Sequence, residues 1–152
     1  MKFAYRRYDT PEKSPLDGAT EVFRPEIPVR LIGKRGDVYV LGLLDSVVLG
    51  RHVAERIGVR LSRKKSWRVH GFGGQSLPAV RGVIDVEIIH RGQSLCWSVP
   101  ISVVTYEDPD QDEVVLLGQS GFLQFFDVRF FGAEHVVELK PNALFPKRAE
   151  SH

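Results

Sequence analysis

The sequence contains a single cysteine, Cys96, a single methionine and a formal net charge of only +2 over 152 residues. One cysteine excludes an internal disulfide and argues against a cysteine-based metal site, so the chain suits a reducing compartment. The near balance of 21 basic and 19 acidic residues does not favour a nucleic-acid partner. No apolar run approaches the ~18 residues of a membrane span. We therefore expect a cytoplasmic protein with neither nucleic-acid nor membrane partners.

Metal and cofactor signals are also missing. The five histidines form no His-x-x-x-His pair or other ligand spacing, so we expect no metal site and no cofactor. One basic run, residues 60–68, includes Trp67 and could bind a phosphate while stacking a base. A solvated loop is the simpler interpretation of this run, because the rest of the chain carries no excess of positive charge.

What the sequence does contain is a succession of short apolar runs separated by turn residues. This pattern is typical of an all-β sandwich or barrel. The best helix candidate covers residues 50–59, where Val53, Ala54 and Ile57 share one face and Gly58 is a left-handed C-cap candidate. We expect an N-terminal arm over residues 1–24, one domain over residues 25–142 and a polar tail over residues 143–152.

Three short segments carry the chemical information. A leucine-rich strand ends at Asp45-Ser46, where the carboxylate either does chemistry or caps the following turn. A glycine-rich hairpin tip follows at residues 71–75. An apolar strand, residues 114–117, then stops at Gly118. Each signal is weak alone, but their order along the chain is more informative.

In this order of elements the chain resembles the retropepsin-like (clan AA) aspartic peptidases of single-domain bacterial type, over roughly residues 24–141. Asp45-Ser46 corresponds to the family's Asp-Thr/Ser-Gly motif, and residues 51–58 to the helix after it. The glycine-rich hairpin corresponds to the flap, which comprises Gly71, Phe72, Gly73 and Gly74. Leu117 and Gly118 correspond to the strand end that packs behind the active-site loop.

The resemblance implies a closed β-barrel of acid-protease type with one short helix after the catalytic strand and a short C-terminal helical segment. It also implies an aspartic endopeptidase in which two aspartates activate a water and share a proton. Only one Asp-Ser motif is present, so Asp45 would have to meet the Asp45 of a second copy in a twofold homodimer. Ser46 would support this pair, and the flap would close over a polypeptide substrate.

The catalytic motif departs from the family pattern. Ser46 is followed directly by Val47, Val48 and Leu49, so the loop is a few residues shorter and lacks the glycine that lets its backbone approach the carboxylates. Whether the chain is an enzyme therefore stays open at this point. The alternative is a catalytically degenerate retropepsin-like domain that binds peptides or serves as an interaction module.

Overall fold

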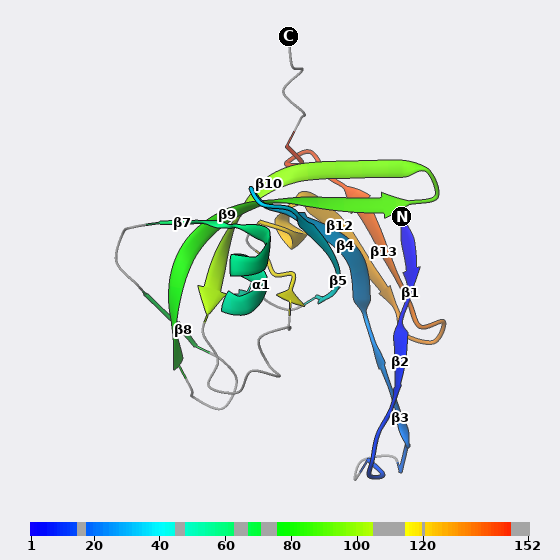
Figure 1. Cartoon of the computed structure of the whole chain (residues 1–152). Helices are drawn as coiled ribbons and strands as arrows, with labels where there is room; N and C mark the ends of the chain where they lie inside the picture. The colour runs from blue at the N-terminus through cyan, green and yellow to red at the C-terminus, as the bar shows by residue number, and fades with distance from the viewer. Residues whose placement is uncertain are drawn as a thin grey trace.

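The computed structural model describes residues 1–14, 18–44, 48–62, 67–70, 76–104, 115–119 and 121–146. Strands account for most of the regular structure in these ranges, which confirms the predicted all-β class (Figure 1). The main sheet contains eight strands: β4 (Glu26–Ile32), β5 (Asp37–Leu43), β6 (Val48–Gly50), β7 (Arg60–Leu61), β8 (Trp67–His70), β9 (Ser76–His90), β10 (Gln93–Val104) and β11 (Val115–Leu116).

The strands of the main sheet are not arranged in chain order. Their sequence across the sheet is β10-β6-β11-β5-β4-β9-β7, with β8 paired to β9. β9 and β10 also pair with each other along their length, from Ala79 opposite Val104 to His90 opposite Gln93. This long hairpin turns at Arg91 and Gly92, which both have positive φ, the conformation that a tight two-residue turn requires.

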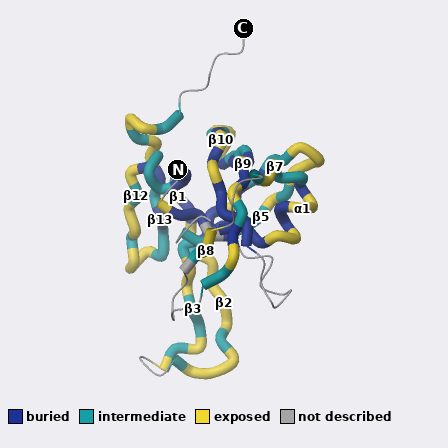
Figure 2. The backbone as a smooth tube through the Cα atoms, turned by 90° about the vertical axis from the view of Figure 1, so that its left-hand side faces the viewer, coloured by how far each residue is buried: buried dark blue, intermediate teal, exposed yellow. Residues whose placement is uncertain are grey.

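Two small sheets use the segment that the sequence predicts to be an arm. β1 (Lys2–Ala4) pairs with β13 (Val136–Pro141), which in turn pairs with β12 (Phe126–Phe131). β2 (Arg6–Asp9) and β3 (Glu21–Arg24) form a separate two-stranded hairpin. Figure 2 shows this hairpin projecting from the body with an exposed surface over most of its length.

The predicted helix is present as α1 (Arg51–Ile57), with Val53, Ala54 and Ile57 buried as expected. Gly58 ends it in the left-handed conformation at φ 71°. The turn after β4 packs closely on this end, since a Cβ at Gly33 would lie 2.1 Å from the Ile57 carbonyl oxygen. The helical segment expected after Gly118 is a 3-10 helix, Leu123–Phe125. In the described part of the chain, no helix is long and apolar enough to cross a membrane.

The centre of the hydrophobic core is Trp97 on β10. Its indole N–H donates a 2.9 Å hydrogen bond to the carbonyl oxygen of Gly121, and its ring is 4% exposed. Four phenylalanine rings lie within 6.5 Å of it, centroid to centroid: Phe122, Phe125, Phe126 and Phe145. The chain after β11 is therefore held against the main sheet by one aromatic cluster.

Replacing this indole should show how much the cluster depends on it. Trp97→Phe leaves the buried Gly121 carbonyl without its donor and reduces the packed volume, so we expect a loss of about 1–3 kcal/mol in the free energy of unfolding. Urea denaturation measures the change. Trp67, the other tryptophan, is 43% exposed and provides the control: Trp67→Phe should change stability by less than about 0.5 kcal/mol. Equal losses in the two variants would contradict this account.

Candidate functional site

The site predicted from the sequence is divided between described and undescribed residues. Asp45 and Ser46 lie outside the described residues, as do Gly71, Phe72, Gly73 and Gly74 of the predicted flap. Leu117 and Gly118 are described, and both are buried. The geometry of the site is therefore that of the strands bordering residues 45–47 and 71–75.

The strands on either side of residues 45–47 are held by a third strand inserted between them. β11 pairs in parallel with β5, placing Leu116 opposite Leu43, and antiparallel with β6, placing the same Leu116 opposite Val48. The Leu117 N–H then donates a 2.7 Å hydrogen bond to the Leu43 carbonyl oxygen. The ends of β5 and β6 that border residues 45–47 are consequently fixed to one backbone, about 10 Å apart, since two strand spacings separate them.

Leu117 fixes β11 by packing against bare backbone. Its side chain, 3% exposed, covers Gly42 on β5 so closely that a Cβ built there would lie 2.4 Å from Leu117 Cδ1. The Gly118 carbonyl oxygen accepts the Leu123 N–H at 2.9 Å, which connects β11 to the 3-10 helix. Leu117 therefore holds β11 against the end of β5, and Gly118 connects β11 to the 3-10 helix.

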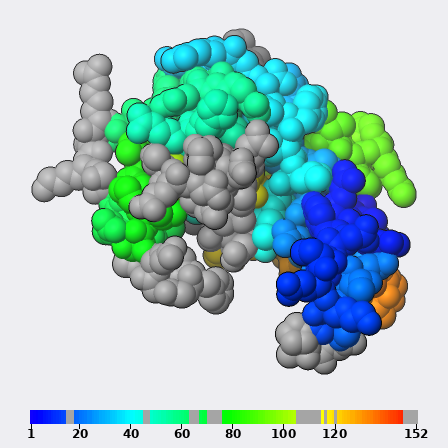
Figure 3. All heavy atoms as spheres, turned by 60° about the horizontal axis from the view of Figure 1, so that its bottom comes forward, coloured from blue at the N-terminus to red at the C-terminus, as the bar shows by residue number. Residues whose placement is uncertain are grey.

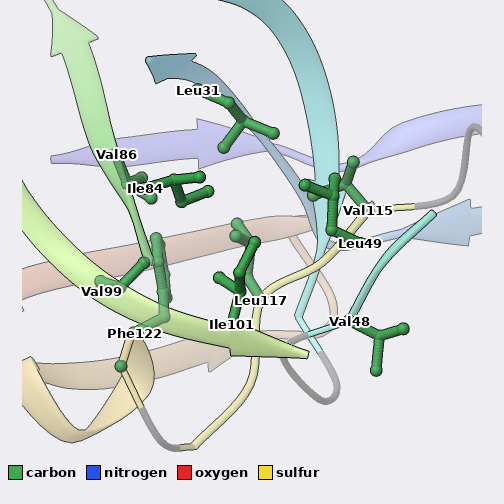
Figure 4. Close-up of a pocket in the computed structure, with 11 residues that line it drawn as sticks. Leu31, Val48, Leu49, Ile84, Val86, Val99, Ile101, Val115, Leu117 and Phe122 are labelled. Carbon is green, nitrogen blue, oxygen red and sulfur yellow. The ribbon is translucent and has the colours of Figure 1, made fainter. Parts of the chain in front are cut away.

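The interior behind this frame is filled with aliphatic side chains. Figure 4 shows Leu49, Val115, Leu117 and Phe122 converging on a cavity of about 10 Å³, at most enough for one water molecule. This core cavity is therefore too small to hold a ligand. Val48 points away from the converging side chains in the same view.

A second, smaller apolar cluster occupies the face toward which Val48 points. Val48, Ala79 and Val104 are buried together, with Val69 and Leu77 packed against them. Val69 and Leu77 are directly opposed on β8 and β9, the two strands that lead into the glycine-rich segment 71–75. The strands that border residues 71–75 and the strand that begins at Val48 thus share one apolar cluster.

One buried carboxylate beside the site was not identified from the sequence. Glu26, 8% exposed, starts β4 opposite Leu43, and its Oε2 accepts a hydrogen bond from the Tyr8 hydroxyl. This bond raises the pKa of the Tyr8 phenol above its usual value. The Arg24 guanidinium lies 5.3 Å from the centre of the Tyr8 ring. No local pattern in the sequence signals this contact, because Tyr8 and Glu26 belong to different sheets.

A larger open groove lies at the far end of β4. It has a volume of about 410 Å³ and includes Ile32, Lys34, Arg60 and Asp85. Six residues of extended strand, roughly 20 Å, separate Ile32 from Glu26. This groove is therefore not continuous with the frame around residues 45–47. Among the described side chains, no group of three or more histidines, cysteines and carboxylates has metal-site geometry.

The close contact between Gly42 and Leu117 can be tested by adding one methyl group. Gly42→Ala should lower the free energy of unfolding by about 1–3 kcal/mol, because the new Cβ displaces Leu117 and with it β11. Thermal or urea unfolding measures the loss. Gly36→Ala is the matched control, since a Cβ there has nothing within 4 Å and its φ is not positive.

A double variant separates the contact from a general intolerance of alanine at position 42. Combining Gly42→Ala with Leu117→Ala should cost less than the sum of the single losses, because the shortened leucine makes room for the methyl group. Additive losses would mean that the two positions do not interact as the structure indicates.

Comparisons with known proteins leave this site without a named relative. Neither the protein-family models nor the curated proteins contain a match to the chain. Interpretation of the site therefore depends on the frame that β5, β6 and β11 build around Asp45-Ser46, and on the chemistry of those two residues.

Proposed function

We propose that the chain is a homodimeric aspartic endopeptidase of retropepsin-like type, in which Asp45 from each of two copies forms the catalytic pair. The observation that carries the proposal is the insertion of β11 between β5 and β6, with Leu43 and Val48 on its two sides. A residue that follows β5 at this point is bordered by strands that cannot separate unless both the β5–β11 and the β6–β11 hydrogen bonds break. Such rigidity is what a pair of catalytic groups needs.

Two further features support the acid-protease architecture. Strand pairings run from β10 through β6, β11, β5 and β4 to β9, and β9 pairs again with β10, which supports a barrel-like arrangement. The β8–β9 hairpin leads into the glycine-rich segment and packs at its base with Val48. This position suits a flap whose backbone groups pair with an extended polypeptide substrate.

The chemistry requires two carboxyl groups in different protonation states. When two carboxylates lie close together, repulsion keeps one of them protonated, so one acts as a base toward water while the other donates a proton to the substrate carbonyl. Their titration belongs to the pair rather than to either residue. In this proposal Ser46 holds the orientation of the carboxylates, while Leu117 and Gly118 support the strand end behind them.

Removal of the carboxylate tests the catalytic role directly. Asp45→Asn should reduce cleavage of an unstructured protein substrate by about 100-fold or more, with wild-type activity falling toward neutral pH as the shared proton is lost. Peptide release is measured from acid to neutral pH. Asp127→Asn, at an exposed position of β12, is the matched control and should keep wild-type activity. Equal residual cleavage by wild type and Asp45→Asn would remove Asp45 from the mechanism.

Dependence on a second copy can be measured by dilution. Because each chain supplies one Asp-Ser motif, activity per chain should fall as the protein is diluted below its dissociation constant, in parallel with the dimer fraction. Sedimentation velocity gives that fraction. Undiminished cleavage by a monomer would contradict the two-aspartate mechanism.

The shortened loop supports a second candidate, a degenerate peptide-binding domain. Ser46 is followed by Val47 rather than glycine, and Val48 is already buried in β6. A β-branched residue resists the backbone conformations that a glycine allows there. A wild-type chain that binds extended peptides, forms dimers and cleaves nothing at any pH would favour this function over proteolysis.

A further inference from the structure

Part of the predicted N-terminal arm is the β2–β3 hairpin, from here on called the arm, which is described over residues 6–14 and 18–24 and stands away from the rest of the molecule. Among the described residues, its two strands pair only with each other: Arg6 opposite Arg24 through Asp9 opposite Glu21. Figure 1 shows it extending beyond the body. All of β2 is exposed. An isolated two-stranded hairpin is marginally stable in water, so an arm of this kind needs support from something else.

The base of the arm is fixed by contacts with the body. The Tyr8 hydroxyl donates to the buried carboxylate of Glu26, and the Phe23 ring stacks on His135 with centroids 3.9 Å apart and planes 9° apart. The Tyr5 N–H donates a 2.7 Å hydrogen bond to the His135 carbonyl oxygen. These contacts set the direction in which the arm leaves the body.

The outer part of the arm is ordered by its own contacts. The Thr10 N–H donates to the Thr20 carbonyl oxygen at 2.9 Å, and Arg7 forms a 2.9 Å ion pair with Glu21. Both outer edges of the hairpin are left unpaired by the described strands. Free strand edges and projecting hairpins are surfaces on which another chain can pack.

The arm starts beside the candidate catalytic segment. Glu26, which receives the Tyr8 hydroxyl, is opposite Leu43, and the Leu44 N–H contacts the Pro25 carbonyl oxygen at 3.5 Å. Figure 3 shows the arm in blue beside the cyan β5 and β6 region, at the same end of the molecule. In the proposed dimer Asp45 lies at the twofold axis, so the arm leaves its own subunit close to that axis.

We propose that the arm of each chain is a strap that packs against a second copy of the same chain. This inference rests on the proposed function, because the twofold axis follows from the pairing of two Asp45 residues. A hairpin anchored near the axis and projecting beyond its own body reaches the neighbouring subunit, and symmetry provides two such contacts per dimer. Beyond the Tyr8 anchor the hairpin continues through Asp9 opposite Glu21 and the hydrogen bond from Thr10 to Thr20 toward its tip.

The chemistry of the arm fits a contact with protein. Tyr8 and Val22 are opposed and share one face, while Arg6 and Arg24 are opposed on that same face nearer the base. Tyr8 remains 38% exposed despite its hydrogen bond. Aromatic and aliphatic side chains next to arginines match the composition of protein interfaces.

Two variants test the strap while leaving the catalytic segment unchanged. The first replaces residues 9–21 with a two-residue Asn-Gly turn, which keeps Tyr8 and Phe23 at their anchors. The second, Val22→Glu, keeps the full hairpin and adds a charge to the face that should contact the partner. Both should raise the dimer dissociation constant at least tenfold in sedimentation equilibrium. Ile89→Ser, at an exposed site on the β9–β10 hairpin, is the control and should leave the dissociation constant unchanged.

Each outcome decides a different point. Weaker dimerisation in both arm variants, with unchanged circular dichroism, supports the strap. If the shortened chain fails to fold, the dimer dissociation constant of the Val22→Glu variant decides whether the arm contributes to dimerisation. A wild-type dimer whose dissociation constant is unchanged in the arm variants overturns the strap and leaves the proposed peptidase intact. A wild-type chain that stays monomeric at every concentration overturns the two-aspartate dimer, and the strap with it.

Discussion

Insertion of β11 between β5 and β6 is the constraint on which the rest of the structure depends. β5 and β6 follow one another in the chain, but β11, a two-residue strand that comes much later, separates them in the sheet. Backbone hydrogen bonds on both sides of β11 hold the ends of the Asp45-Ser46 segment in place. Side-chain packing then secures the arrangement, because Gly42 leaves room for Leu117 and the Trp97 cluster holds the chain that follows.

The surroundings of this constraint differ on the two faces of the sheet. Main-core side chains fill the space behind β11 and leave a cavity too small for a ligand. Val48 turns to the other face and joins the base of the β8–β9 hairpin. Glu26 and Tyr8 stabilise the adjacent strand and fix the arm beside it.

Local features of the fold could be predicted from the sequence because local chemistry determines them. The apolar spacing of Val53, Ala54 and Ile57 and the glycine after them predicted α1 and its end, as found. Short apolar runs between turn residues likewise predicted the all-β class. The predicted site could be assembled only through the order of elements, and its central residues, Asp45 and Ser46, remain predictions.

Long-range features could not be read in the same way. β11 is a two-residue strand whose partners are set by pairing with distant segments, so periodicity carries no trace of its position. An N-terminal arm was predicted, but its β2–β3 pairing was not, because Arg6 to Asp9 shows no apolar alternation. Burial of Glu26 depends on Tyr8, a residue in a different sheet, and no local pattern signals that contact.

The late position of β11 also determines when the molecule can become complete during synthesis. β5, β6 and α1 leave the ribosome first, but the two ladders that fix them require a strand encoded far downstream. Contacts between such distant segments form slowly, because a long loop must close before any pairing offsets its entropy. A nascent chain therefore carries β5 and β6 without their shared partner until β11 has emerged, so the frame that borders residues 45–47 is completed late in synthesis.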